Sequence, residues 1–392
     1  MTIQIVNISY HDVFKRYGGK YNIFRDLYEK DLLGLEIRNI EQELSEKVRR
    51  IFLDNKEICY SVKNENNSSD FLALGSFSVL KDLSKIVLSA GNEDLGYKIS
   101  KVFGNIRNYD QKYFKIDSLI YPLTNSYVMG ILNVTPDSFS DGGKYFNTDD
   151  AVRHAIEMID EGADFIDIGG ESTRPGSEKV ETDEELRRVI PVIEKLISKR
   201  PGTIISIDTT KSAVAKEALN SGAKIVNDIS GGTFDKNILN VVSEFKAAMV
   251  IMHIKGTPKV MQNNPFYEDV VSEVYDFLSE KAEEAEKYGI KNLFIDPGIG
   301  FGKRVEDNFE LVKRLNEFKS IGYPILIGMS RKSFLGKTLG NNIDERENAT
   351  TVAETIAVNN GARIVRTHNV KNAAEAKKII NFVNNPEKFF ND

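Results

Sequence analysis

From residue 128 onward, one pattern of hydrophobic and polar positions repeats eight times along the chain. Each repeat begins with a short apolar or β-branched run, continues with polar residues and ends in an amphipathic stretch. Such runs predict strands that are buried on both faces, and intervals of about 20 to 46 residues leave room for crossover helices. The predicted strands are residues 128–134, 165–169, 204–207, 224–229, 247–252, 293–295, 324–329 and 363–365.

Helix signals fill the intervals between these strands. Apolar residues recur at i, i+3, i+4 and i+7 from Val152, and Gly162 is placed to end that helix. Thr182 and Glu185 form a capping-box pattern that predicts the start of the next helix. Pro191 lies inside this second helix and should kink it or delay its start.

The number of repeats favours a closed barrel. Eight βα units in about 265 residues match the ~250 residues of a typical (β/α)₈ barrel, or TIM barrel. A doubly wound sheet is the competing α/β architecture, but it has no reason to stop at eight strands. We therefore predict a (β/α)₈ TIM barrel for residues 111–392.

The first part of the chain has a different pattern. Residues 1–110 mix strand-like and helical segments and carry no phosphate loop, metal-ligand spacing or nucleophile motif. They predict a small α+β accessory domain of unknown role. The strand-like segments are 3–8, 35–38, 58–62 and 71–77, and the helical ones are 41–52, 79–88 and 94–102.

Composition and charge narrow the classes of function. A net charge of −6 gives no basic field that would recruit nucleic acid or anionic lipid. The single cysteine, Cys59, excludes an intrachain disulfide and a multi-cysteine metal site. No apolar run reaches the ~20 residues of a membrane helix, and the N-terminus lacks a secretory pattern. We expect a cytoplasmic protein with no nucleic-acid or membrane partner.

Polar residues follow directly after each predicted strand. In a barrel these positions converge on the carboxyl rim, where catalytic groups lie. A single Asp or Asn there is as often a turn or cap residue, but eight such strand ends together predict a functional site. The polar residues at these ends are Asn133, 171–174, Asp208, Asn227 with Asp228, His253 with Lys255, Asp296, 330–333, and Arg366 with His368.

Some of these groups match the edge of a flat heterocycle. A pterin or a guanine presents N–H donors and ring-nitrogen acceptors, which carboxylates, an amide and an ammonium group can bind. The residues that supply this mixture are Asp208, Asn227, Asp296 and Lys332.

Other rim groups match an anion and a metal ion. Arg174, Arg366 and His368 supply positive charge of the kind that binds a phosphate or diphosphate. Asn133 and Asp141 offer hard oxygen ligands for a Mg²⁺ ion that keeps most of its waters. The segments 135–143 and 172–177 are rich in turn formers and glycine, which is typical of lids over a site.

Two long motifs carry a family resemblance. Residues 129–143 read MGILNVTPDSFSDGG, and residues 169–176 read GGESTRPG. In these motifs the chain resembles the dihydropteroate synthases, which are pterin-binding TIM-barrel enzymes. Shorter matches follow in the order of that family: SIDT at 206–209, NDISG at 227–231, MH at 252–253, DPGIGFGK at 296–303, SRKS at 330–333 and RTH at 366–368.

The resemblance implies a transferase of folate biosynthesis. Such an enzyme joins the amine of p-aminobenzoate to the methylene carbon of 7,8-dihydropterin-6-ylmethyl diphosphate and gives dihydropteroate and diphosphate. Diphosphate loss would leave a pterin-methylene cation for the amine to attack, with Mg²⁺ as the cofactor. We expect these small-molecule substrates as ligands and a homodimer as the assembly.

The resemblance also implies roles for individual residues. The catalytic residues would be Asp208, Lys332, Asp141 and Arg174. The pterin would be bound by Asp208, Asn227, Asp296, Lys332 and Met252, and the diphosphate by Asn133, Arg366 and His368. The residues around p-aminobenzoate would be Phe139, Thr173, Arg174, Pro175, Phe301 and Ser333, and the metal ligands would be Asn133 and Asp141.

Two departures and two alternatives remain. Asn369 stands where the family generally has Asp, and compact family members lack the N-terminal domain. A methyltetrahydrofolate:corrinoid methyltransferase shares the pterin-binding barrel, but it needs no diphosphate site. The loops 135–143 and 172–177, Lys332 and the pair of Arg366 and His368 therefore argue against it. A non-catalytic pterin-binding or scaffold protein is the second alternative, with the N-terminal domain as its interaction module.

Overall fold

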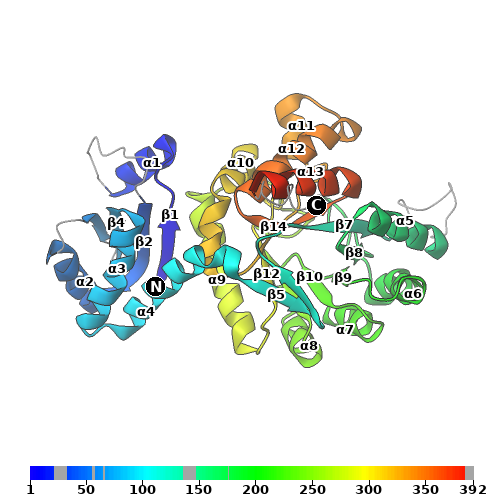
Figure 1. Cartoon of the computed structure of the whole chain (residues 1–392), viewed down its shortest axis with the longest axis horizontal. Coiled ribbons are helices and arrows are strands. Elements are labelled where there is room, and N and C mark those ends of the chain that lie inside the picture. The colour runs from blue at the N-terminus through cyan, green and yellow to red at the C-terminus, as the bar shows by residue number, and fades with distance from the viewer. Residues whose placement is uncertain (22–32, 55–57, 65–66, 136–146, 175, 385–392) are drawn as a thin grey trace. The chain divides into compact units, whose positions relative to one another are not determined.

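The structure is a computed structural model that describes residues 1–21, 33–54, 58–64, 67–135, 147–174 and 176–384. The chain forms two compact units (Figure 1). Unit 1 consists of Met1–Tyr109 together with Glu317–Gly322, and unit 2 consists of Asp110–Asn316 together with Tyr323–Asp392. The sequence did not predict that the six residues 317–322 belong with the N-terminal part of the chain.

Unit 1 is a four-stranded antiparallel sheet with helices on both faces. Its strand order is β1-β2-β4-β3. The sequence predicted every element of this α+β unit except α1, which contains the adjacent glycines Gly18 and Gly19 and so has a low helix propensity. The strands are β1 (Thr2–Val6), β2 (Leu33–Glu41), β3 (Cys59–Asn64) and β4 (Ser68–Gly75), and the helices are α1 (His11–Tyr21), α2 (Gln42–Asp54), α3 (Phe77–Ser89) and α4 (Glu93–Arg107).

Strand alternation divides the side chains of this sheet between two cores. One face carries Ile5, Leu35 and Phe71 against apolar residues of α2, α3 and α4. On the other face, Val6 and Leu72 pack with residues of α1. Because successive strand residues point to opposite faces, each core uses every second position.

The face below α1 also holds a buried carboxylate. Glu36 of β2 is 0% exposed. Its carboxylate accepts hydrogen bonds from Lys20 Nζ at 2.6 Å and from the Tyr21 hydroxyl at 2.7 Å, and Arg38 pairs with it as well. A buried charge is tolerated only when it is paired and hydrogen-bonded, so this cluster fixes α1 on the sheet.

The segment 317–322 is held in unit 1 by specific hydrogen bonds. Gln4 Nε2 donates to Glu317 Oε2 at 3.1 Å, and the backbone N–H of Asn7 donates to Glu317 Oε1 at 2.9 Å. Asn105 Nδ2 donates to the carbonyl of Ser320 at 2.9 Å. Glu317 and Ser320 are both buried. Unit 1 therefore supplies the polar partners of a segment that lies between two barrel elements in the sequence.

Unit 2 is a closed barrel of eight parallel strands, as predicted (Figure 1). The last strand pairs with the first in the register Thr367↔Gly130, which closes the barrel. All strands are largely buried, in agreement with their continuous apolar runs. The strands are β7 (Tyr127–Asn133), β8 (Phe165–Gly169), β9 (Ile205–Asp208), β10 (Ile225–Asp228), β11 (Ala248–Met252), β12 (Leu293–Asp296), β13 (Ile325–Ile327) and β14 (Ala362–Thr367).

Helices follow the barrel strands. Among the residues that the structure describes, none of the helices combines the length and the hydrophobicity that a membrane-spanning segment needs. Gly162 ends α5 with φ 110°, as expected for a glycine cap. The helix α6 begins at Thr182 and runs through Pro191, so the prediction of a delayed start was wrong. The helices are α5 (Thr148–Glu161), α6 (Thr182–Lys199), α7 (Ser212–Asn220), α8 (Asn237–Phe245), α9 (Val270–Lys287), α10 (Val305–Lys313), α11 (Ser333–Leu339), α12 (Glu347–Asn359) and α13 (Val370–Asn384).

The predicted capping box at the start of α6 was also wrong. Glu181 is the N-cap residue, and its side chain makes no cap hydrogen bond. Glu185 is buried instead, and it accepts a hydrogen bond from Lys211 Nζ at 2.5 Å. An ion pair with a residue after β9 thus replaced the local bond that the sequence pattern indicated.

A hairpin covers the amino end of the barrel. It consists of β5 (Tyr113–Ile116) and β6 (Leu119–Pro122). The ring of Phe114 packs edge-on against Phe294, with centroids 4.9 Å apart, and it also contacts Tyr127 and Phe165. These three partners lie at or near the starts of β12, β7 and β8. The hairpin therefore closes the end of the barrel opposite to the rim that carries the polar strand ends.

Removal of residues 1–109 should destabilise the remaining chain. Glu317 would lose its hydrogen bonds from Gln4 and Asn7, and each hydrogen bond to a charged group contributes about 1.5–3 kcal/mol. We expect the fragment 110–392 to aggregate or to melt roughly 5–10 °C below the full chain in a calorimetric scan. The full chain with Gln4→Ala serves as the control, because it loses a single one of these bonds. A fragment that melts at the temperature of the full chain would contradict this prediction.

Candidate functional site

The carboxyl rim of the barrel brings the predicted heterocycle-binding residues together. Asp208 is the last residue of β9, Asn227 lies in the neighbouring β10, and Asp296 is the last residue of β12. All three side chains are buried although they are polar or charged. Parallel strands end at the same edge, so three positions far apart in the sequence converge on one site.

One hydrogen-bonded network joins two of these residues, Asp208 and Asn227, through Asp167 and Arg366. Arg366 Nη2 donates to Asp208 Oδ2 at 2.7 Å. Arg366 Nε donates to Asp167 Oδ2 at 2.6 Å, and Asn227 Nδ2 donates to the same oxygen at 2.9 Å. A single guanidinium group thus links two carboxylates, and the second carboxylate holds the amide.

Sequence reasoning missed Asp167. This residue is 0% exposed and lies in the middle of β8, between Ile166 and Ile168. A charged residue inside an otherwise apolar, doubly buried strand must point to a partner in the interior, and that signal was present in the sequence. Asp167 orients both Arg366 and Asn227, so it belongs to the site.

Burial changes the proton affinity of the site residues. It raises the pKa of Asp208 well above its usual range, against the opposing charge of Arg366. It raises the pKa of Asp296 to about 6, although the backbone N–H of Gly298 donates to this carboxylate at 2.7 Å and Lys332 and Lys303 also favour its ionised form. Burial lowers the pKa of Lys332 to about 8, and the charge of Arg366 adds to that effect. Near neutral pH, Asp296 and Lys332 therefore still carry opposite charges.

An apolar wall lies beside these charged groups. The ammonium group of Lys332 lies 4.0 Å from the centroid of the Phe301 ring. Phe301 belongs to a buried cluster with Met252, Ile229, Ile254 and Met261. A polar edge next to an apolar wall is the arrangement that a flat heterocyclic ligand requires.

The residues after β14 form the next part of the rim. His368 Nδ1 lies 2.9 Å from Ser330 Oγ, and its backbone N–H donates to the same oxygen at 3.2 Å. Burial and the charge of Arg366 lower the pKa of His368 to about 3, so this ring is neutral at physiological pH. In this state Arg366, and not His368, supplies positive charge. Asn369 keeps the capping role, since its Oδ1 accepts from the backbone N–H of Asn372 at 3.1 Å.

The loop after β8 is held by ion pairs and backbone contacts. Lys211 binds both Glu171 and Glu185, and Ser177 Oγ donates to the carbonyl of Ser172 at 2.5 Å. Thr173 is half-buried in this loop, and Arg174 is exposed. The structure therefore places these two residues on the rim.

Other predicted residues are described in part. Asn133, the last residue of β7, is half-buried, and Ser333 is the exposed first residue of α11. Phe139, Asp141 and Pro175 lie outside the residues that the structure describes.

The described residues contain no group of three or more His, Cys, Asp or Glu side chains that could hold a metal ion. Of the two predicted ligands, the described part of the chain includes Asn133 alone, which offers one amide oxygen. This donor set does not fit a metal site made of protein ligands only. It fits a Mg²⁺ ion that takes most of its ligands from water and from substrate oxygens.

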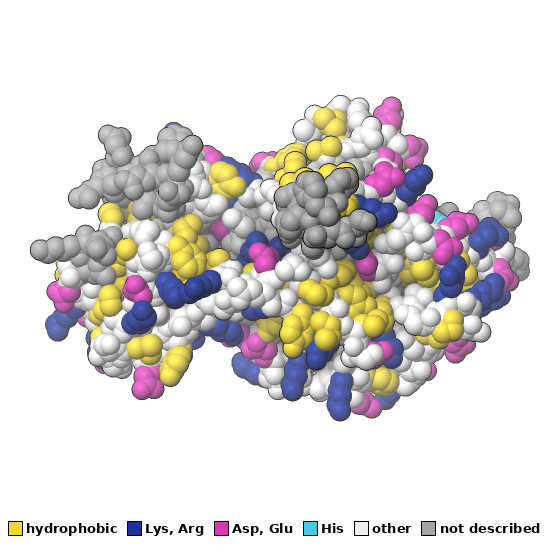
Figure 2. Space-filling model, viewed as in Figure 1, with side chains coloured by type: hydrophobic (Ala, Val, Ile, Leu, Met, Phe, Trp, Pro, Cys, Tyr) yellow, Lys and Arg dark blue, Asp and Glu magenta, His cyan; other side chains and the backbone are white. Residues whose placement is uncertain are grey.

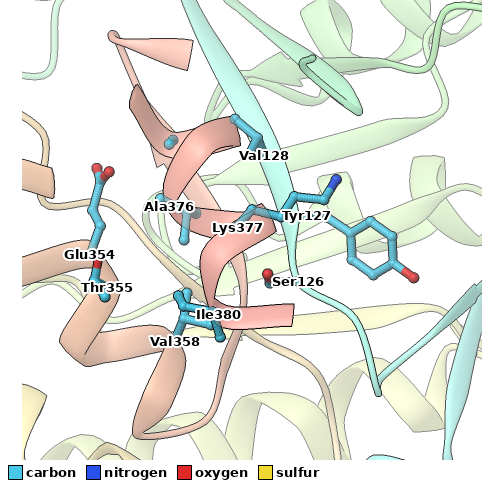
Figure 3. Close-up of a pocket in the computed structure, with 11 residues that line it drawn as sticks. Ser126, Tyr127, Val128, Glu354, Thr355, Val358, Ala376, Lys377 and Ile380 are labelled. Atoms are coloured by element: carbon cyan, nitrogen blue, oxygen red, sulfur yellow. The ribbon is translucent and has the colours of Figure 1, made fainter. Parts of the chain in front are cut away.

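A pocket on the outside of the barrel is separate from this rim. It lies between α12, α13 and the strands β7 and β14 (Figure 3). Most of its lining is apolar, and Lys377 is already paired with Asp164 at 2.7 Å. Burial raises the pKa of Glu354, at its edge, to about 8. The pocket thus offers no free charge for an ionic ligand.

Comparisons with known proteins agree with this geometry. The family model of pterin binding enzymes matches residues 129–368. The dihydropteroate synthase of Escherichia coli K12 is 45% identical over 260 residues, which cover 66% of this chain and 92% of that protein. That of Synechocystis is 46% identical over 258 residues, which cover 65% of this chain and 89% of that protein.

Solved structures give the same result for the fold. A dihydropteroate synthase of Yersinia pestis, in a sulfonamide drug complex, aligns with a TM-score of 0.65 and 40% identity over 69% of this chain and 98% of that chain. The Xanthomonas albilineans enzyme in complex with 7,8-dihydropteroate aligns with a TM-score of 0.63 and 37% identity over 70% of this chain and 99% of that chain. From the family match, these relatives and the rim residues in their motifs, the chain belongs to the pterin-binding enzyme family and, within it, to the dihydropteroate synthases.

Proposed function

We propose that the barrel rim condenses 7,8-dihydropterin-6-ylmethyl diphosphate with p-aminobenzoate to give dihydropteroate and diphosphate. The observation that carries this proposal is the network of Arg366 with Asp208, Asp167 and Asn227, next to Asp296 and Lys332. It combines a hydrogen-bonding edge for a pterin with a buried cation for an anionic leaving group.

The pterin edge would be read by the carboxylates and the amide. Asp296 and Asp208 accept N–H bonds from the 2-amino-pyrimidinone edge, and Asn227 can serve a ring nitrogen or the carbonyl. Lys332 donates to the opposite side of the ring system. Met252 and Phe301 cover its flat face, as their place in the buried apolar cluster allows.

The leaving group would be bound at the end of β14. Arg366 supplies positive charge, and His368 supplies a neutral ring that Ser330 orients. Asn133 would hold a Mg²⁺ ion together with Asp141, and the ion would supply charge neutralisation for the diphosphate. When the C–O bond breaks, cationic charge develops on the pterin methylene, and the carboxylate of Asp208 stabilises that charge.

The acceptor amine would approach from the loop after β8. Thr173, Arg174 and Pro175, with Phe139 and Ser333, are the proposed surroundings of p-aminobenzoate. Arg174 is exposed, so its guanidinium group can reach a substrate carboxylate at the mouth of the site. The lone pair of the amine then forms the new C–N bond to the methylene carbon that diphosphate has left, and the nitrogen releases its proton to water.

The alternative of a corrinoid methyltransferase is less well supported. Such an enzyme has no anionic leaving group to bind, whereas here a guanidinium group lies buried between two carboxylates on the rim. We place the reaction in the cytoplasm, in line with the single cysteine of the chain.

We also propose that the barrel domain forms a homodimer through α10, α12 and α13. Hydrophobic side chains are visible over α11 and α12 (Figure 2). Exposed apolar residues occur on neighbouring helices, and a face of this kind is best covered by its own copy around a two-fold axis. These residues are Phe309, Val352, Ile356, Ile379 and Val383.

Removal of the Lys332 ammonium group should weaken pterin binding. A hydrogen bond to a charged group contributes about 1.5–3 kcal/mol, so Lys332→Ala should raise the Kd for 6-hydroxymethylpterin roughly 10- to 100-fold in calorimetry. Lys337→Ala is the matched control, because Lys337 is an exposed lysine on α11, the helix that begins directly after Lys332. Equal affinity of the Lys332→Ala variant and the wild type would remove Lys332 from the pterin site.

The decisive experiment is an assay of dihydropteroate formation from the two substrates. We expect turnover with Mg²⁺ and a strong loss after chelation, since the diphosphate charge is then not neutralised. Asp208→Ala should lower turnover by roughly 10²–10³-fold, because a preorganised charge opposite the developing cation is lost. Asp160→Ala, on the exposed end of α5, is the control. No product with the wild type would refute the proposed reaction, and near-normal turnover of Asp208→Ala would refute the role of that carboxylate.

A charge placed on the exposed apolar face should separate the dimer. Ile356 is 49% exposed on α12, and Ile356→Asp should halve the mass measured by light scattering after gel filtration. Leu53→Asp provides the control, since Leu53 is 65% exposed on α2 of unit 1. A monomeric wild type, or a dimeric Ile356→Asp variant, would contradict the proposed interface.

A further inference from the structure

A lysine that the proposed reaction does not use is buried behind the pterin-binding wall. Lys303 is 3% exposed, and it follows the glycine-rich segment after β12. Lysine is almost never fully buried unless its charge is compensated. Such a residue therefore requires an explanation from its surroundings.

The ammonium group of Lys303 has three neutral acceptors. Its Nζ lies 2.9 Å from His253 Nδ1, 3.4 Å from the carbonyl of His253 and 3.1 Å from the carbonyl of Phe301. Burial and the charges of Lys303 and Lys255 lower the pKa of His253 to about 2, so its ring is neutral and Nδ1 can accept. These contacts use the three N–H donors of an ammonium group.

These contacts join two rim segments. His253 follows β11, and Phe301 lies in the segment 296–303 after β12. The backbone N–H of His253 also donates to the carbonyl of Asp296 at 3.1 Å. Gly298 has φ 69°, and a Cβ atom there would lie only 1.9 Å from the carbonyl oxygen of His253. The two segments are thus in backbone contact, and Lys303 binds both of them.

We propose that Lys303 is a positioning residue of the pterin site, whose ammonium group fixes the segment after β11 against the segment after β12. The inference rests on the proposed function, because its consequence is the placement of Met252, Phe301 and Asp296. Met252 directly precedes His253, and Phe301 carries one of the carbonyls that Lys303 binds. The ring of Phe301 in turn lies against the ammonium group of Lys332.

Lys303 also acts on Asp296 through its charge. The groups that face this carboxylate are Lys303, Lys332, Arg366 and the backbone N–H of Gly298, and all four favour its ionised form against burial. Burial lowers the pKa of Lys303 itself to about 7, so it is charged in the range below neutrality where Asp296 titrates. Loss of Lys303 should therefore move the titration of Asp296 to higher pH.

The test is the pH dependence of pterin binding by the full chain. We expect the affinity of the wild type for 6-hydroxymethylpterin to fall as the pH drops through about 6, because Asp296 then takes up a proton. For Lys303→Met we expect a Kd about 10-fold higher at pH 7 and a midpoint about one pH unit higher. Binding of inorganic diphosphate should change less than about twofold, since Arg366 and His368 contact other segments.

Two further variants separate the effect of the lost charge on binding from an effect on folding. Lys303→Gln keeps N–H donors without the charge, so it should retain most of the affinity at pH 8 and still show the shifted midpoint. It also serves if Lys303→Met does not fold. Lys291→Met is the matched control, an exposed lysine shortly before β12 that should leave Kd and midpoint unchanged.

The outcomes distinguish this inference from the proposed function. Folded Lys303 variants with the affinity and midpoint of the wild type would overturn the role of Lys303 and leave the reaction intact. A wild type that binds no pterin would overturn both. A weaker affinity with an unshifted midpoint would overturn the effect on Asp296 and leave only a packing role for this lysine.

Discussion

The requirement that buried charges be paired determines the arrangement of this barrel. Asp167 and Asp208 are buried in the barrel interior, where an isolated carboxylate would be very costly. Arg366 compensates both, and Asn227 donates a second hydrogen bond to Oδ2 of Asp167. Because these four residues come from β8, β9, β10 and β14, their pairing requires the closed barrel. The same closure that buries the strands thus creates the polar centre of the site.

Burial also brings the pKa values of an acidic and a basic group of this site close to neutrality. Burial brings the pKa values of Asp296 and Lys332 to about 6 and about 8, so that both lie near neutrality. Electrostatic interactions in a buried site are stronger than in water. The side chains are already in place, so they need not reorganise when charge develops on a ligand. Two lysines with different surroundings, Lys332 at the ligand and Lys303 behind the wall, would divide contact and positioning between them.

The sheet of unit 1 is covered by helices on both faces, and the residues buried on the two faces differ in kind. One face packs mainly apolar residues, whereas the other holds Glu36 with Lys20, Tyr21 and Arg38. The segment 317–322 is part of the same compact unit. The connection between α10 and β13 is therefore shaped by residues more than 300 positions earlier in the chain, such as Gln4. The family match begins at residue 129, so residues 1–109 of unit 1 lie outside it.

The sequence by itself determined the eight barrel strands, their order and the rim residues Asp208, Asn227, Asp296, Lys332 and Arg366. Strand periodicity and position after a strand are local properties, and parallel connectivity places all strand ends on one rim. Only the tertiary structure decided which of these groups pair, that Glu185 turns to Lys211, that His368 is neutral and that Lys303 is buried. The reason is physical: burial and long-range pairing depend on neighbours that are distant in sequence, and single-residue patterns do not encode them.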